Sequence, residues 1–212
     1  MAYIRTEGVI LSHKNFSEAD HLLTIFTRDK GKISCIAKGA RRPRSRKSGH
    51  VQLGNWCKIF VAIGKNIDIL TEVETKRPFG FEKLSPAKAV QIYHLLELTE
   101  SLTETHQKNI AIFSLLVNFL KKINNDENFN LISTVFKVKL LSNLGFFSAK
   151  NLTDSRLKDF FQTIEVEDPD IISKNLKLTP ENYLKVLAFL DSIIENLAQR
   201  KLKTSRFVAS YG

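Results

Sequence analysis

The sequence predicts an α+β fold of two domains, a small five-stranded closed barrel in residues 1–79 followed by an all-helical domain in residues 80–212. Three observations support this division. Short β-type segments separated by glycine turns fill the first third, and helical spacing replaces them from Ser85 onward. Residues 1–80 carry 15 lysines and arginines against 7 acids, whereas residues 81–212 carry 17 against 15. The basic excess therefore belongs to the first domain and suggests a polyanionic partner for it.

The predicted barrel consists of five strands, at residues 3–12, 21–28, 33–38, 55–63 and 67–74. Gly31 supplies the positive φ of one tight hairpin, and the stretch Gly64-Lys65-Asn66 marks another. Five short antiparallel strands suit a closed barrel better than a sandwich, which usually needs about seven.

The fourth predicted strand has two different faces. Its inward face carries Cys57, Ile59, Val61 and Ile63, and its outward face carries Trp56, Lys58, Phe60 and Ala62. Aromatic rings beside a cation are the side chains that stack on nucleic-acid bases. The alternative is that this outward face packs against the rest of the protein.

The second domain is predicted to be helical throughout. Ser85-Pro86 forms an N-cap and first turn, and further helices are expected at about residues 105–123, 128–144 and 180–201. Gly145 is a good C-terminal stop for the third helix. The pattern weakens into short helical or irregular pieces between residues 147 and 178, with Lys76-Arg77-Pro78-Phe79-Gly80 as the expected domain junction.

The segment KGARRPRSRK, residues 38–47, joins the third strand to the fourth and holds six cations: Lys38, Arg41, Arg42, Arg44, Arg46 and Lys47. Guanidinium groups match phosphate oxygens in bidentate fashion, so the segment is a candidate phosphate-binding loop. Other interpretations are a solvated loop, a docking site for an acidic protein tail, or a membrane-surface patch, which usually has an adjoining apolar face that is missing here.

Catalytic constellations are not evident. The sequence lacks the phosphate-loop, nucleophile-elbow and HExxH patterns, so we expect a protein that is not an enzyme. Glu72 and Glu74 share a strand face, and Glu165, Glu167, Asp168 and Asp170 cluster around Pro169; metal-dependent nuclease chemistry at the second group is a minor alternative. Cys35 and Cys57 are expected to be buried thiols rather than a zinc half-site with His13 or His21, so no cofactor is predicted.

The chain shows no signal peptide and no apolar run of the roughly 18–20 residues that a membrane span needs. We therefore expect a soluble, cytoplasmic protein that makes no membrane contact.

Several motifs resemble the bacterial DNA repair and recombination family RecO. They are TEGVIL at residues 6–11 with FSEAD at 16–20, and FTRDKGK at 26–32 with AKGARR at 37–42. Weaker similarity lies in LSNLGF at 141–146 and in the basic end RKLKTSR at 200–206. The resemblance covers residues 3–80 well and the remainder loosely.

The resemblance implies an N-terminal OB-fold barrel, a helical domain and association with the bacterial nucleoid in the cytoplasm. Members of the family bind single- and double-stranded DNA and anneal complementary strands. They also bind RecR and the acidic tail of the single-strand-binding protein SSB, and with these partners they help to load RecA on SSB-coated DNA. Carried over by motif, Lys38, Arg41 and Arg42 would contact DNA. Arg44, Arg46 and Lys47 are added from charge and proximity, and Trp56, Lys58 and Phe60 from the outward strand face.

The sequence departs from the family at one point. Many members carry a four-cysteine zinc site after the LGF segment, but no cysteine follows Phe146 here, so no zinc is expected. Residues 147–178 should instead be held by apolar packing through Leu157, Phe160, Phe161 and Ile164. The alternative function is an OB-fold module that binds RNA or an acidic protein without annealing DNA.

Overall fold

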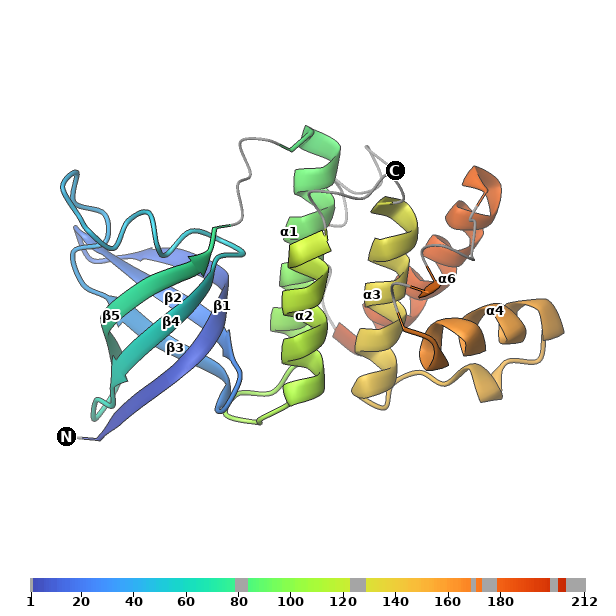
Figure 1. The fold of residues 1–212 in the computed structure, drawn as a ribbon, viewed down its shortest axis with the longest axis horizontal. Coiled ribbons are helices and arrows are strands. Elements are labelled where there is room, and N and C mark those ends of the chain that lie inside the picture. Colours follow the sequence, from blue (N-terminus) through green and yellow to red (C-terminus); the bar gives the residue numbers. More distant parts are fainter. Residues whose placement is uncertain are drawn as a thin grey trace. The chain divides into compact units, whose positions relative to one another are not determined.

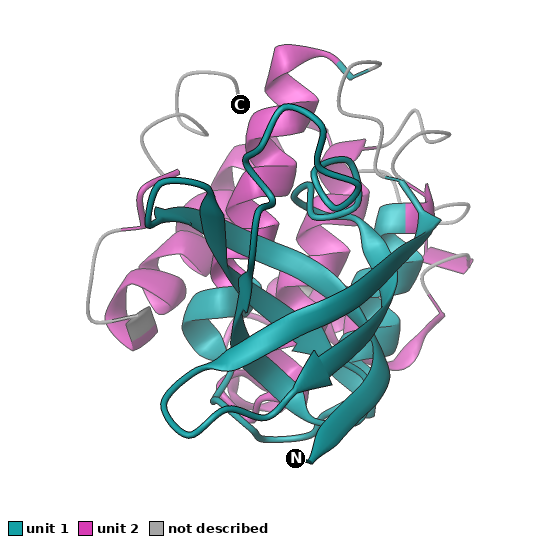
Figure 2. Ribbon diagram, turned by 90° about the vertical axis from the view of Figure 1, so that its left-hand side faces the viewer, with its two compact units in different colours: residues 1–84, 99–120 teal, residues 85–98, 121–212 magenta. Residues whose placement is uncertain are grey.

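The computed structural model describes residues 2–78, 84–122, 129–168, 171–172, 179–198 and 202–204. The chain divides into two compact units, shown in Figure 2: residues 1–84 with 99–120, and residues 85–98 with 121–212. We call them the barrel unit and the helical unit. The predicted domain boundary after residue 79 falls outside the described residues and stays a prediction.

The barrel unit contains five strands that close on themselves in the order β1-β2-β3-β5-β4 (Figure 1). The strands are β1 (Tyr3–Phe16), β2 (Asp20–Thr27), β3 (Gly31–Ala37), β4 (Trp56–Ala62) and β5 (Asp68–Arg77). All neighbours pair antiparallel except β3 and β5, which meet in parallel at Cys35 and Ile36. This confirms the predicted five-stranded OB-fold barrel followed by helices.

Strand β1 is longer than predicted because it serves two neighbours. Its first half pairs with β4, from Tyr3 opposite Ala62 to Val9 opposite Trp56, and its second half pairs with β2. The register shifts between Ile10 and Ser12, and such an irregularity bends a strand and increases its twist. The bend allows one strand to close the barrel.

The barrel core is apolar and includes both cysteines. Its fully or nearly fully buried members are Ile10, Leu23, Ile25, Ile33, Cys35, Ala37, Ala40, Val51, Cys57, Ile59, Val61 and Leu70. Burial raises the pKa of Cys35 to about 12 and that of Cys57 to about 11, as expected for buried thiols. Ile63, predicted to point inward, is instead 44% exposed, because β4 ends one residue earlier, at Ala62.

Residues 99–120 belong to the barrel unit and include the end of α1 (Pro86–Leu102) and most of α2 (Ile110–Lys122). The Lys32 ammonium donates to the carbonyls of Glu100 and Thr103, both at 2.5 Å. The prediction that the second helix begins near Thr105 was wrong. Thr105 instead forms a bridge with Lys32, whose carbonyl accepts the His106 N–H, and the helix begins after Asn109, whose side chain accepts the Ile112 N–H at 3.0 Å.

The helical unit contains the first part of α1, then α3 (Phe129–Asn143), the 3₁₀ turn η2 (Ala149–Asn151), α4 (Ser155–Val166) and α6 (Pro180–Ala198). Ser85 is confirmed as an N-cap, since its hydroxyl accepts the Lys88 N–H. Gly145, at φ +77°, ends α3 in a Schellman motif, in which Phe146 N–H bonds to Leu141 C=O and Gly145 N–H to Ser142 C=O. No helix among the described residues is long and apolar enough to span a membrane.

The stretch after Gly145 is held by an aromatic cluster and one carboxylate. Phe161 and Ile164 are fully buried, as predicted, and the Phe161 ring lies 5.2 Å from that of Phe147 and 5.6 Å from that of Phe189. The Glu165 carboxylate accepts the Ser142 hydroxyl at 2.6 Å and the Ala149 N–H at 3.1 Å. Leu157 and Phe160 are partly buried, and residues 169–170 and 173–178 lie outside the described residues.

Candidate nucleic-acid interface

We call residues 38–47 the basic segment. Its first half is fixed by hydrogen bonds to the turn between β1 and β2. The Asp20 carboxylate accepts the Gly39 N–H at 2.7 Å, and the Arg41 N–H donates to the Ala19 carbonyl at 2.9 Å. The Arg41 guanidinium donates through Nη1 to the carbonyls of Ser17 and Glu18, at 3.3 and 3.1 Å. Two motifs some twenty residues apart in the chain therefore form one hydrogen-bonded unit.

The basic segment is also anchored in the barrel. Ala37 and Val51 are at most 1% exposed and belong to the apolar core, so the chain enters the core on both sides of the charged residues. The Lys47 ammonium donates to the Leu70 carbonyl on β5 at 2.7 Å, and burial lowers its pKa. Backbone hydrogen bonds, from Arg42 N–H to Gly39 C=O and from Ser45 N–H to Arg42 C=O, fold the segment into successive turns.

The remaining cations of the segment are exposed. They are Lys38, Arg42, Arg44 and Arg46, and within the described part of the chain no hydrogen bond or ion pair engages their side chains. In the described part of the chain, the basic segment thus has two cations whose side chains bind backbone carbonyls, the exposed Arg41 and the partly buried Lys47, and four exposed cations that make no such bond.

The outward residues of β4 lie where the alternation predicted, but each has neighbours of its own. The Lys76 ammonium sits over the Trp56 ring, 4.0 Å from its centroid. Lys58 forms an ion pair at 3.8 Å with Glu74 on the neighbouring strand β5, and both side chains are exposed. The Phe60 ring stacks on that of Tyr3, with centroids 5.1 Å apart and an angle of 7° between the planes.

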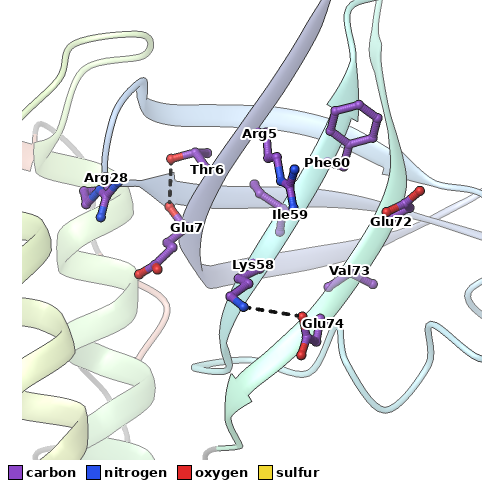
Figure 3. A pocket seen from close by; sticks show the side chains of 10 residues that line it. All are labelled: Arg5, Thr6, Glu7, Arg28, Lys58, Ile59, Phe60, Glu72, Val73 and Glu74. Atoms are coloured by element: carbon purple, nitrogen blue, oxygen red, sulfur yellow. Dashed lines mark hydrogen bonds and ion pairs between the residues drawn. The ribbon is translucent and has the colours of Figure 1, made fainter.

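A groove of about 560 Å³ runs over this face of β1, β4 and β5 (Figure 3). Its ten lining residues are Arg5, Thr6, Glu7, Arg28, Lys58, Ile59, Phe60, Glu72, Val73 and Glu74. Three of them are cationic and three are carboxylates. Figure 3 shows Lys58 and Phe60 projecting from β4, between Arg5 on β1 and the two glutamates of β5.

From the sequence we named one cation of this face, Lys58, and two aromatics, Trp56 and Phe60, but missed Tyr3, Arg5 and Arg28. Arg5 lines the groove and Tyr3 stacks on Phe60 because β1 pairs with β4, in a register that places Arg5 opposite Phe60. Alternation within residues 3–12 could have put Tyr3 and Arg5 on one face, but pairing between the first and fourth strands has no local signal.

Of the acidic residues considered for metal chemistry, Glu165 has a carboxylate that is engaged in hydrogen bonds. Glu165 binds Ser142 and Ala149, and the carbonyls of Glu165 and Glu167 accept bonds from the Lys139 ammonium, at 3.3 and 2.8 Å. No set of three metal-ligating side chains comes together within the described ranges, and Asp170 lies outside them.

The fold and this surface define a class: an OB-fold barrel with a fixed basic loop, joined to an all-helical region. Comparison with known proteins gives the family. Residues 1–79 match the model of the recombination protein O N terminal region, and residues 86–148 match that of its C terminal region. The chain belongs to the RecO family.

Curated relatives carry the name DNA repair protein RecO. The protein from Caldicellulosiruptor bescii is 34% identical over 149 residues, covering 69% of this chain and 60% of the relative. That from Symbiobacterium thermophilum is 30% identical over 147 residues, covering 69% of this chain and 58% of the relative. The match thus spans somewhat more than half the length of these relatives.

Proposed function

We propose that this chain is a non-enzymatic mediator of DNA repair and recombination. It binds single- and double-stranded DNA, anneals complementary strands, and acts with RecR to help load RecA onto DNA coated by SSB, whose acidic tail it binds. Membership of the RecO family and the names of the relatives support this proposal.

The observation that carries the DNA-binding part is the display of four solvent-facing cations on a loop whose backbone is fixed. Lys38, Arg42, Arg44 and Arg46 lie within nine residues between two buried anchors, Ala37 and Val51. Phosphate contacts of this kind supply affinity without sequence information. Neutralising phosphates on two strands lowers their mutual repulsion, which is what annealing requires.

Arg41 and Lys47 have a different task in this proposal. Their side chains donate to backbone carbonyls of the β1–β2 turn and of β5, so they hold the loop in place. If four cations rather than six reach single-stranded phosphates, the slope of log K against log salt is about −3, at roughly 0.7 per contact.

The test compares three variants by measuring the salt dependence of single-stranded DNA binding. Arg42→Ala with Arg44→Ala flattens the slope by about 1.4. The matched control, Lys30→Ala with Lys65→Ala, removes two exposed cations from other turns of the barrel and leaves the slope within about 0.3. Lys47→Met lowers the melting temperature but keeps the slope. Equal slopes for the first two variants would remove the basic segment from the DNA site.

Annealing is tested separately, with complementary strands in the presence and absence of SSB. The wild-type chain should accelerate pairing, and Arg42→Ala with Arg44→Ala should slow it. Binding of DNA without annealing would instead indicate a plain OB-fold module for RNA or an acidic protein, and cleavage that depends on Mg²⁺ would contradict the non-enzymatic assignment.

A further inference from the structure

The groove over β1, β4 and β5 differs from the basic segment in its charge. Its three cations, Arg5, Arg28 and Lys58, are matched by Glu7, Glu72 and Glu74. A phosphate backbone binds where positive charge is in excess, and carboxylates repel it. The groove therefore has no electrostatic reason to hold phosphates, although it lies on the same barrel.

The groove offers an aromatic surface instead. Phe60 is partly buried and stacks in parallel on Tyr3, which is 52% exposed. This neighbour fixes the Phe60 ring, so a planar ligand would not have to order it. Stacking of a base on such a ring tolerates any base, because every base has a π-face.

The carboxylates of β5 supply hydrogen-bond acceptors beside this ring. Glu72 lies opposite Phe60 in the β4–β5 register, and Glu74 lies opposite Lys58. Both side chains are exposed, and among the described residues their one ion pair is the 3.8 Å contact of Glu74 with Lys58. Carboxylates accept from the exocyclic amino group of cytosine, whereas thymine presents carbonyl oxygens at the corresponding positions.

The opposite side of the barrel is less available. OB-fold barrels commonly bind oligonucleotides on the face of their second and third strands. Here Lys32 of β3 donates to carbonyls of residues 100 and 103, and a Cβ on Gly31 would lie 2.1 Å from the Gln107 carbonyl oxygen. Residues 100–107 of the barrel unit thus lie against the β2–β3 hairpin.

We infer that the groove binds an unpaired nucleobase, separately from the phosphates held by the basic segment, and favours bases that carry an amino group over thymine. The base stacks at Phe60 and directs its amino group to Glu72 or Glu74. This inference rests on the proposed function, since it assigns a second, single-strand-specific site to the same DNA ligand. Duplex DNA, whose bases are paired and stacked, engages only the basic segment.

The experiment measures binding of oligo-dC, oligo-dT and a duplex, each of about 12 nucleotides per strand, within the range that one OB-fold barrel covers. Raised salt weakens the phosphate contribution. We expect wild-type protein to bind oligo-dC about fivefold more tightly than oligo-dT. Glu72→Gln with Glu74→Gln should bring this ratio close to one, since an amide both accepts and donates. Glu104→Gln with Glu195→Gln, two exposed glutamates outside the groove, should keep it.

Phe60→Leu tests the stacking surface with apolar packing against Tyr3 retained. The substitution should weaken the binding of both single-stranded oligonucleotides about fivefold. It should leave the affinity for the duplex and the salt slope unchanged. Equal wild-type affinity for oligo-dC and oligo-dT would overturn the inference. An equal gain in affinity for both oligonucleotides in the variant Glu72→Gln with Glu74→Gln would also overturn it, because the carboxylates would then merely repel phosphate. If Phe60→Leu impaired only RecR or SSB binding, the groove would be a protein surface.

The two proposals fail in different ways. Equal salt slopes for Arg42→Ala with Arg44→Ala and for the control Lys30→Ala with Lys65→Ala contradict the proposed function, whether or not the groove shows a base preference. A normal slope difference with no base preference contradicts only the inference about the groove.

Discussion

The barrel unit and the helical unit differ in where their ionisable side chains lie. The barrel keeps an apolar core that contains two neutral thiols, and it displays most of its cations at the surface. The helical unit buries ionisable groups: Lys137 is 4% exposed and His94 is 3% exposed. Lys137 donates to Asp191 at 3.2 Å, and burial lowers the pKa of its ammonium.

His94 belongs to a hydrogen-bonded chain within the helical unit. The Thr204 hydroxyl donates to the Glu97 carboxylate at 2.6 Å, so the Nδ1 of His94, 2.9 Å from the Thr204 oxygen, is the donor of that contact. Glu97 also accepts the N–H groups of Lys203 and Thr204. The net charge of a unit therefore does not indicate what its ionisable groups do. We expect salt to govern ligand binding by the barrel unit, and pH to govern the folding stability of the helical unit.

The ion pair between the buried Lys137 and the partly exposed Asp191 should show the largest effect. Asp191→Ala leaves the Lys137 ammonium buried without its carboxylate and should lower the free energy of unfolding by about 3 kcal/mol. Lys137→Met fills the same space without a charge and should stay within about 1 kcal/mol of wild type. Urea denaturation measures both, and equal losses would show that the charge itself contributes nothing.

Lys32 is a partly buried cation of the barrel unit that donates to two carbonyls, at the end of α1 and just after it. Lys32→Met should cost about 2–3 kcal/mol, since hydrogen bonds to a charged group are lost and two carbonyls lose their donor. Lys58→Met, which removes an exposed pair, should cost less than about 0.5 kcal/mol. Thermal denaturation of the two variants would contradict the distinction if their losses were the same.

The helical unit should also be sensitive to mild acid. Burial, and secondarily the charge of Lys137, lower the pKa of His94 to about 3. The unfolded chain therefore binds a proton near the ordinary imidazole pKa of about 6.5, before the folded chain does, and stability falls as pH drops from there toward 3, by about 1.4 kcal/mol per unit. His94→Gln should reduce the stability difference between pH 7.5 and pH 5 by about 2 kcal/mol; an unchanged difference would contradict this assignment.

The smallest expected effect is that of a chelator. The stretch from Phe147 to Glu165 is held by stacked phenylalanines and by the bonds of Glu165, which are independent of metal. The melting temperature with EDTA should equal that without it. A lower value, restored by added zinc, would show that metal holds this stretch.

Much of the fold could be predicted because its signals are local. Alternation and glycine turns located the five strands, and Ser85 and Gly145 marked helix ends through their own cap geometry. The start of α2 could not be predicted, because residues 105–107 follow a helical pattern but are drawn into contact with Lys32 and Gly31. A partner some 70 residues away outweighs local preference there.

The candidate site could be predicted only as a list of residue types. The six cations of the basic segment look alike in the sequence, yet Arg41 and Lys47 bind backbone carbonyls, which carry no sequence signal. The outward position of Trp56, Lys58 and Phe60 followed from alternation. The groove did not, because it needs the pairing of β1 with β4 and the carboxylates of β5.

The two buried thiols have a practical consequence for following these events by fluorescence. Cys35 and Cys57 are the only cysteines of the chain, and at neutral pH their raised pKa values leave almost no thiolate to react with a maleimide. A single cysteine placed at an exposed position, such as Gly49→Cys beside the basic segment, where an added Cβ meets no atom within 4 Å, or Lys65→Cys on a distant turn, would be labelled selectively in the otherwise unaltered protein. A dye pair on this chain and on DNA could then report separately where each strand lies.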